Sequence, residues 1–308
     1  MSLADRLRFD PAEGTVIRRP PGTGYGYWVG GHKVSYDGDQ FALFYRERQP
    51  LETGRGGRCA VAVSHDGLAF DDVWSATKGE LNASSIEVGH PVRHDETECR
   101  LYVSYEIAGT STWRIDVLRG GSFADLDTQG RRTVLNPGDY RLPWIKDPVV
   151  YREADGYRVF AAAPPRSEPV DDGSQRSACA LDATVVADSD DGLVFPLIDY
   201  VFEAPGGNVW HANRARINSV FKVDGQWVAT FDGGRTFYDN YEEWAGLAIS
   251  EDGIHFTRID MAEPWVQSPH GSVRYVYGLP HENGVLFYYE YTTQDGSHDL
   301  RVARVELS

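Results

Sequence analysis

The sequence predicts an all-β fold, namely a five-bladed β-propeller whose four-stranded antiparallel blades surround a central channel. Two observations predict it: a turn motif that recurs at even spacing, and the near absence of continuous helical periodicity. The motif Ser-x-Asp-Gly-[Leu/Ile]-x-Phe stands at 64–70, 189–195 and 250–256, each time after an apolar run. Asp-Gly between two strand-like runs favours a hairpin, because both residues tolerate a positive φ.

The spacing of the motif sets the number of blades. Ser189 and Ser250 are 61 residues apart, and Ser64 and Ser189 are 125 apart, about two such periods. A degenerate copy at 118–126 falls between them. The period fits five times into 308 residues and leaves room for four short strands in each unit, which is typical of propeller blades. Two packed β-sandwiches are the alternative, but they would not explain a uniform period.

The whole chain, 1–308, is therefore expected to be one domain, and its N-terminal segment is available to close the ring of blades. In each blade a first strand, a turn and a second apolar strand recur. The expected blades are roughly 28–80, 85–140, 144–204, 214–265 and 271–308. Their first strands with the following turns are expected at 29–38, 87–96, 147–156, 216–225 and 275–284.

Charge and hydropathy exclude several partners. The net charge of −16 makes nucleic acid and anionic membranes unlikely partners, because both are themselves negative. No apolar run approaches the ~20 residues that span a bilayer. The N-terminal segment is charged and lacks an apolar core, so no secretory signal is visible and a cytoplasmic location is expected.

One face of a propeller gathers the start of each first strand and the end of each second strand. Reading those positions collects carboxylates, arginines and aromatic residues around the channel mouth, where a propeller has its concave pocket. The expected catalytic residues are Asp147, Glu87, Glu106 and Asp232. The expected substrate-binding residues are Arg216, Arg274, His32, Arg46, Trp28, Trp144 and Tyr241, with Arg48 as a further candidate.

Carboxylates in this arrangement suit the cleavage of a glycosidic bond. One acid must protonate the leaving oxygen, and another must activate water or attack the sugar. Crowded carboxylates raise one another's pKa, so that one of them can stay protonated near neutral pH. Trp and Tyr rings can stack on the apolar faces of sugars. The alternative is that each charged residue lies at a solvent-exposed strand end and has no role in catalysis or binding.

Two segments carry a resemblance to a known group of proteins. KDPVVYREADGYRVF, 146–160, resembles the Asp-Pro strand of the five-bladed glycosidases of families 43 and 32. The segment 225–256 resembles their later-blade pattern, in which a Tyr-rich strand leads into Ala-x-Ser-x-Asp-Gly. The resemblance implies a glycoside hydrolase with a base Asp in blade 1, a pKa-tuning Asp in blade 3 and an acid Glu in blade 4.

Only the blade 3 residue of that set matches, as Asp147. The blade 1 position falls at Val29–Gly30, with His32 nearby, and the blade 4 position falls at Arg216. Glu203, in FEAPGG, resembles the acid motif but lies thirteen residues too early. Catalysis could be rebuilt from Glu87, Asp147, Glu106 and Asp232, with His32 or His211 as a proton donor.

Three functions remain open. The first is a glycoside hydrolase for a small glycoside or oligosaccharide, with the arginines binding the carboxylate of an acidic sugar. In the second, the propeller binds a sugar without turnover, and in the third it is a scaffold with a protein-binding rim. The arginines could equally serve to neutralise the acids. No cofactor is required, and the nine His show no paired metal-ligand spacing. Ca²⁺ in the channel is compatible with the carboxylates.

Overall fold

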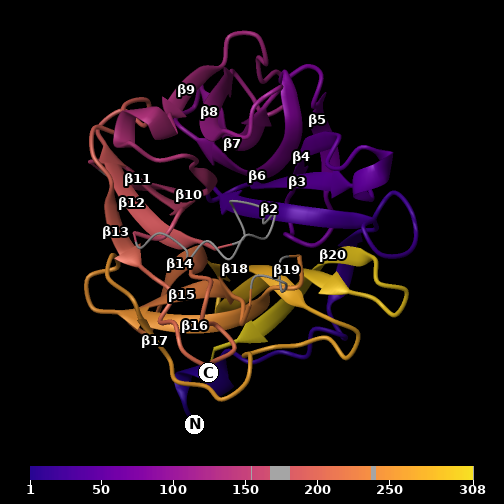
Figure 1. The fold of residues 1–308 in the computed structure, drawn as a ribbon, viewed down its shortest axis with the longest axis vertical. Coiled ribbons are helices and arrows are strands. Elements are labelled where there is room, and N and C mark those ends of the chain that lie inside the picture. The colour runs from indigo at the N-terminus through magenta and orange to yellow at the C-terminus, as the bar shows by residue number, and fades with distance from the viewer. Residues whose placement is uncertain (154, 167–180, 237–240, 308) are drawn as a thin grey trace.

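The computed structural model describes residues 1–153, 155–166, 181–236 and 241–307, and they form an all-β fold (Figure 1). Three sheets hold four antiparallel strands each, in chain order. The first contains β6 (Ala83–Arg93), β7 (Cys99–Ile107), β8 (Trp113–Gly120) and β9 (Arg132–Leu135). The second contains β10 (Lys146–Glu153), β11 (Gly156–Ala163), β12 (Ala183–Ser189) and β13 (Asp199–Phe202). The third contains β14 (Arg216–Val223), β15 (Gln226–Gly233), β16 (Trp244–Ser250) and β17 (Thr257–Arg258).

A fourth sheet has eight strands in the order β18-β19-β20-β2-β3-β4-β5, with β1 paired to β20. Its strands are β18 (Val273–His281), β19 (Gly284–Thr292), β20 (His298–Glu306), β1 (Thr15–Arg18), β2 (Trp28–Tyr36), β3 (Phe41–Arg48), β4 (Arg58–Ser64) and β5 (Asp71–Thr77). One parallel pair, Trp28 with His298, joins its two halves. In Figure 1 the strands β2, β6, β10, β14 and β18 lie nearest the centre. The arrangement is consistent with the predicted propeller.

The three repeated motifs form the predicted turns between a third and a fourth strand. Each Ser hydroxyl donates to the Asp carboxylate at 2.8, 3.1 and 2.8 Å and accepts from the Gly amide at 2.9 Å. The glycines Gly67, Gly192 and Gly253 have φ between 70° and 76°. This left-handed conformation is why glycine follows the Asp in all three copies.

The strands nearest the centre share a second feature, an irregular register close to their N-terminal ends. The breaks lie between Gly30 and Lys33, Ile86 and Gly89, Lys146 and Val149, Ile217 and Ser219, and Arg274 and Tyr277. Bulges of this kind bend a strand and redirect its side chains. They determine how the residues of the candidate site point.

The start of β6 differs from the sequence prediction. The strand was expected to begin at Glu87, but it begins at Ala83 and pairs there with Ile107. Glu87 therefore lies inside the strand, within the register break, and not at its first position. The other four central strands begin within two residues of their predicted starts.

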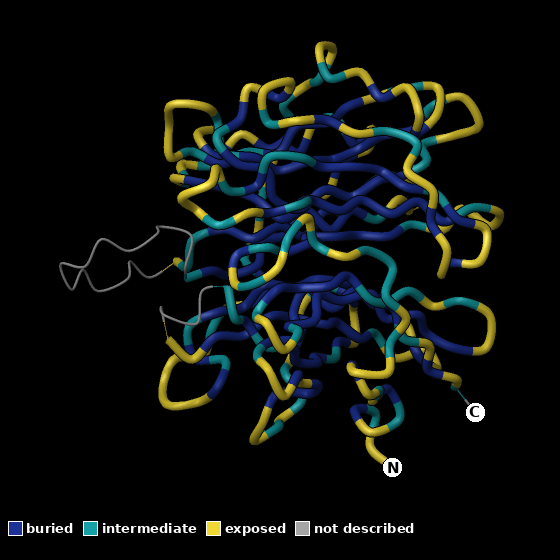
Figure 2. Tube along the Cα trace, turned by 90° about the vertical axis from the view of Figure 1, so that its right-hand side faces the viewer, coloured by how far each residue is buried: buried dark blue, intermediate teal, exposed yellow. Residues whose placement is uncertain are grey.

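The N-terminal segment packs under the eight-stranded sheet. The short helix α1 (Leu3–Arg6) is capped by Ser2, and β1 adds antiparallel to β20. The backbone carbonyl of Ala4 accepts from the Trp265 indole at 3.1 Å, and Phe9 contacts the rings of Trp265 and Tyr289. No helix in the described part of the chain is long and apolar enough to cross a membrane. Figure 2 shows buried strands in the interior and exposed residues mainly in the connecting loops.

Candidate active site

A ring of buried charged side chains lies at the N-terminal ends of the central strands, and we call it the charge ring. None of its members exposes more than 3% of its surface. Its arginines are Arg46, Arg48, Arg214, Arg216 and Arg274, and its carboxylates are Glu87, Asp147, Asp182, Asp232, Glu243 and Glu290. Buried charges of opposite sign in nearly equal number can compensate one another, which is what permits them inside a protein.

Arg216, the first residue of β14, joins three carboxylates from different parts of the fold. Its Nη1 lies 3.0 Å from Asp147 Oδ2 of β10, and its Nη2 lies 2.7 Å from Asp232 Oδ2 of β15. The same Nη2 lies 3.6 Å from Glu243 Oε1. The guanidinium also stacks 4.2 Å above the ring of Tyr275. Asp147 and Asp232, both predicted, are thus brought to the two arms of one guanidinium.

Arg274 has the corresponding position on β18. Its Nε lies 2.8 Å from Glu290 Oε2, and its Nη1 lies 2.8 Å from Glu243 Oε2. Glu290 also accepts from the backbone amide of Gly31 at 2.7 Å and lies 3.2 Å from His298 Nδ1. Both predicted arginines, Arg216 and Arg274, therefore bind carboxylates of the protein itself.

Glu87 is held by three arginines of the eight-stranded sheet and its loop. Its oxygens lie 3.1 Å from Arg46 Nε, 3.2 Å from Arg48 Nη2 and 3.6 Å from Arg55 Nη2. Burial acts to raise the pKa of Glu87, but the charges of Arg48 and Arg46 outweigh it and hold the pKa far below the usual range. The structure therefore favours Glu87 as a permanent carboxylate that fixes the arginines, and not as a proton donor.

Two other predicted carboxylates have the opposite tendency. Burial raises the pKa of Asp232, although Arg216 opposes the change. Burial also raises the pKa of Glu106, which is only partly buried at the end of β7. For the neighbouring Glu243, burial acts in the same direction, but Arg274 and Arg214 outweigh it and lower the pKa strongly. Carboxylates whose pKa values are pushed apart in this way are the arrangement that acid and base roles require.

The backbone is strained at two of the register breaks. Asp147 and Tyr275 have φ of 57° and 52°, a left-handed conformation that non-glycine residues rarely adopt. Asp147 Oδ1 is also buried without a hydrogen-bond partner among the described residues. Strained residues of this kind cluster at functional sites, because the surrounding structure must hold them there.

The equivalent position on β2 is Gly31, which has a φ of 57°. A Cβ atom at Gly31 would approach Arg46 Nε to 2.9 Å, and one at Gly30 would approach Glu290 Cγ to 2.0 Å. The space where the resemblance places the blade 1 base is therefore occupied by Glu290 and Arg46.

The predicted aromatic residues divide into two groups. Trp144 is 1% exposed and packs with Trp113, so it belongs to the core and does not offer a platform to a sugar. Trp28 stacks on His298 at 4.9 Å and contacts Tyr241 at 5.3 Å. Trp28 and Tyr241, with Arg48 and Arg55, line a cavity of about 170 Å³ next to the charge ring.

Burial lowers the pKa of both predicted histidines. His32 is fully buried, and burial lowers its pKa to about 3. His211 packs edge-on against Trp210, and burial lowers its pKa as well. Glu203 does not join the charge ring, because it follows the outermost strand β13 and pairs with Arg166 at 3.5 Å.

The sequence analysis missed Asp182, Glu243 and His298. Asp182 precedes β12, Glu243 precedes β16, and His298 begins β20. All three therefore stand at the start of a third strand, which returns from the same face on which the second strand ends. The position before each third strand is the signal in the sequence that would identify all three residues.

The carboxylates that were expected to suit a Ca²⁺ ion are paired with arginines. Within the described ranges, no three His, Cys, Asp or Glu side chains are placed to hold a metal ion. Asp147, Asp232 and Glu243 already have a guanidinium within 3.0 Å. Carboxylates that are neutralised by arginine are poor ligands for a divalent cation.

No protein-family model and no curated protein matches the chain. Solved structures match almost its whole length. A structure described as a glycoside hydrolase has a TM-score of 0.68 at 13% identity, covering 99% of this chain and 94% of the other. The β-1,2-mannobiose phosphorylase of Listeria innocua has a TM-score of 0.63 at 13% identity, covering 99% and 96%. The GH43_1 enzyme of Xanthomonas citri in complex with xylose has a TM-score of 0.61 at 12% identity, covering 98% and 92%.

These similarities concern the fold, and they support the predicted all-β propeller architecture. The chain has the β-propeller fold shared by glycoside hydrolases of family 43 and by a levansucrase. At 10–13% identity the match concerns the fold and does not assign a substrate.

Proposed function

We propose that the protein cleaves glycosidic bonds by carboxylate chemistry at the charge ring, with a small glycoside or oligosaccharide as substrate. The observation that carries the proposal is that Arg216 holds Asp147 and Asp232, two carboxylates from different strands, at 3.0 and 2.7 Å inside one buried cluster. Burial raises the pKa of Asp232, while nearby Glu243 is held ionised by arginines. The fold is one on which such enzymes are built, but the fold alone would not carry the proposal.

The proposal includes five blades around a channel. Each four-stranded sheet is one blade, and the eight-stranded sheet is two blades joined at Trp28 and His298. The second of these blades then consists of β18, β19, β20 and the N-terminal strand β1. Contacts from β2 to β6, β6 to β10 and β14 to β18 support this count.

Asp232 is the proposed proton donor, because it is the member of the predicted set with a raised pKa inside the charge ring. Asp147 is the proposed base or nucleophile, since one of its oxygens has no hydrogen-bond partner in the described part of the chain. Arg216 holds the two carboxylates through its Nη1 and Nη2 atoms. Glu106 is the second candidate for the donor, because it is less buried and also has a raised pKa.

An acidic sugar is the proposed substrate class. Arg46 Nη1 and Arg274 Nη2 are buried donors that lack a hydrogen-bond acceptor among the described residues. Buried guanidinium groups with spare donors suit a carboxylate on the substrate. The ion pairs with Glu87, Glu243 and Glu290 favour the competing view that the arginines only neutralise the acids.

The test is hydrolysis of a panel of neutral and uronic aryl glycosides by the wild type, Asp232→Asn and Asp147→Asn. Both substitutions should lower kcat by a factor of about 10² to 10⁴, the usual contribution of acid–base catalysis. Asp188→Asn is the matched control, because Asp188 is an exposed aspartate on β12 that pairs with Arg158. It should leave kcat unchanged. Turnover that persists in both ring variants would overturn the assignment.

Sugar binding without turnover is the second candidate, and the near-complete pairing of the charge ring favours it. It predicts that no glycoside in the panel is hydrolysed while the folded protein binds a uronic acid. Weaker binding by Arg274→Met would then assign the arginines to ligand recognition. Hydrolysis by the wild type excludes this candidate.

A further inference from the structure

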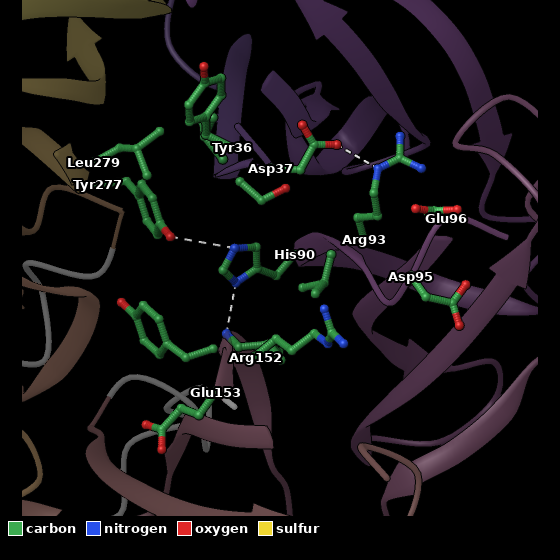
Figure 3. A pocket seen from close by; sticks show the side chains of 15 residues that line it. Tyr36, Asp37, His90, Arg93, Asp95, Glu96, Arg152, Glu153, Tyr277 and Leu279 are labelled. Carbon is green, nitrogen blue, oxygen red and sulfur yellow. Dashed lines mark hydrogen bonds and ion pairs between the residues drawn. The ribbon is translucent and has the colours of Figure 1, made fainter. Parts of the chain in front are cut away.

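A separate pocket of about 640 Å³ opens at the other end of the central strands, and we call it the rear pocket (Figure 3). Its walls come from the C-terminal parts of β2, β6, β10 and β18, whereas the charge ring stands at their N-terminal parts. The volume is within the range of about 300–1,000 Å³ typical of small-molecule sites. Nothing in the proposed chemistry uses this pocket.

The floor of the rear pocket is a polar pair fixed by the backbone. His90 is 2% exposed, and its Nδ1 accepts a hydrogen bond from the amide of Val150 at 2.7 Å. The imidazole is therefore neutral with its proton on Nε2, in keeping with a pKa that burial lowers to about 3. That Nε2 faces the hydroxyl of Tyr277 at 3.5 Å, as Figure 3 shows. The Tyr277 hydroxyl, which also interacts with the Tyr151 side chain, is the polar group that the floor presents to a ligand.

The rim offers acceptors and donors together. Asp95, Glu96 and Glu153 are exposed carboxylates, and Arg152 is an exposed guanidinium. A second arginine of the rim already forms an ion pair with Asp37 at 2.5 Å. An anion would meet more carboxylates than free guanidinium groups, so it is disfavoured. A cation is the competing ligand, because the rim carries more exposed carboxylates than free guanidinium groups, and the titration with spermidine tests it.

The remaining walls are apolar or aromatic. They include the side chains of Val34, Val92, Val150 and Leu279 and the rings of Tyr36 and Tyr151. Apolar patches beside paired carboxylate, guanidinium and hydroxyl groups match a ligand that is itself uncharged and carries hydroxyls on an apolar ring.

From this arrangement we infer that the rear pocket is a second binding site, specific for neutral sugars. It binds a mono- or oligosaccharide, with its hydroxyls bound to the Tyr277 hydroxyl and the rim and its apolar face against the valine and tyrosine walls. Because none of its residues belongs to the charge ring, the site does not depend on the proposed catalysis. It would keep the protein attached to a polysaccharide whatever the charge ring does.

The experiment is calorimetric titration with xylobiose, cellobiose and β-1,2-mannobiose, combined with tryptophan fluorescence. No tryptophan lines the rear pocket, whereas Trp28 lies beside the charge ring. Binding that releases heat without changing fluorescence is therefore expected for the rear pocket. Tyr277→Phe and Arg152→Met should each weaken it about tenfold, the effect of roughly one lost hydrogen bond.

Arg152→Met carries no risk to folding, because Arg152 is exposed. Tyr200→Phe is the matched control for the loss of a hydroxyl, since Tyr200 lies on the outermost strand β13, where its hydroxyl donates to the Pro164 carbonyl at 2.7 Å, and lines neither the rear pocket nor the cavity beside the charge ring. It should leave the titration unchanged. Absence of binding by all three sugars at millimolar concentration would overturn the inference. So would binding that neither rear-pocket variant weakens, or heat of binding from spermidine in place of the sugars.

Discussion

Burial and neighbouring carboxylates act in opposite directions on the pKa of Lys33. Its side chain is fully buried on β2, with the Nζ atom 3.5 Å from Asn218 Oδ1 and 5.6 Å from the centre of the Tyr277 ring. Burial lowers the pKa of Lys33 to about 7, although Asp147 and Asp232 act against it. The amine therefore lies between the charge ring and the floor of the rear pocket, and it loses its charge near neutral pH.

This predicts a stability that depends on pH through one residue. Between about pH 7 and 10 the unfolded chain keeps a proton that folded Lys33 has released, so the free energy of unfolding rises with pH. Below pH 7 both states are protonated, and the cost of burying the charge is fully present. Lys33→Met should remove a rise of about 2 kcal/mol between pH 7 and 9, as measured by urea unfolding.

Lys222→Met provides the matched control, because Lys222 is exposed and lies over the Trp227 ring. Its unfolding curves should keep the pH dependence of the wild type. If the free energy of unfolding changed with pH in the same way for Lys33→Met and the wild type, Lys33 would not be the group that causes the pH dependence.

The Ser-x-Asp-Gly turn is the element that repeats most faithfully. In the copy at 189–192, one Asp191 oxygen accepts from the amides of Leu193 and Val194 at 2.8 and 3.1 Å. The Ser189 hydroxyl accepts from Gly192 at 2.9 Å. Three backbone donors of one turn are thus satisfied by two side chains, which fixes the connection between β12 and β13.

Removing that carboxylate should weaken the turn. Asp191→Ala is expected to lower the free energy of unfolding by about 1 to 2 kcal/mol, the usual effect of losing a side-chain cap for backbone amides. Asp190→Ala, at the exposed neighbouring aspartate, is the control and should change it by less than about 0.5 kcal/mol. Chemical denaturation of the two variants measures the difference. Equal losses would show that the turn does not depend on the Asp191 contacts.

The elements that can be predicted from the sequence are those that depend on interactions between residues close together in the chain. Hydrogen bonds between residues only a few positions apart form the three turns at 64–70, 189–195 and 250–256. These turns can therefore be predicted from the sequence. The pairing of Glu87 with Arg46 cannot, because it joins strands of different sheets 41 residues apart. The low pKa of Glu87 depends on this distant contact, so it could not be predicted from the sequence either. Glu243 stands before a third strand, a position that a prediction from first and second strands does not cover.

At the scale of the whole molecule, the N-terminal segment completes a sheet that the rest of the chain leaves open. β1 pairs with β20, and Phe9 packs on Trp265, Phe287 and Tyr289. Without this segment β20 would present an unpaired edge, which favours association with other chains.

Deletion of residues 1–18 should therefore lower Tm by at least about 5 °C and promote self-association. Thermal denaturation and size-exclusion chromatography measure the two effects. Arg6→Ala is the control, because it removes only a partly exposed ion pair with Asp224, which is worth at most about 1 kcal/mol. A truncated protein that stays monomeric with an unchanged Tm would contradict this role of the N-terminal segment.

The charge ring also connects the sheets energetically. Arg46 and Glu87 join the eight-stranded sheet to the sheet of β6, and Arg216 and Asp147 join the sheets of β14 and β10. If one sheet opened alone, its neighbours would keep buried charges without partners, at a cost of several kcal/mol for each broken pair. Partial unfolding is thereby penalised more than complete unfolding. The protein should melt as one cooperative unit, although three of its four sheets are local in the sequence. The residues proposed for chemistry would then be the same ones that prevent a half-open molecule.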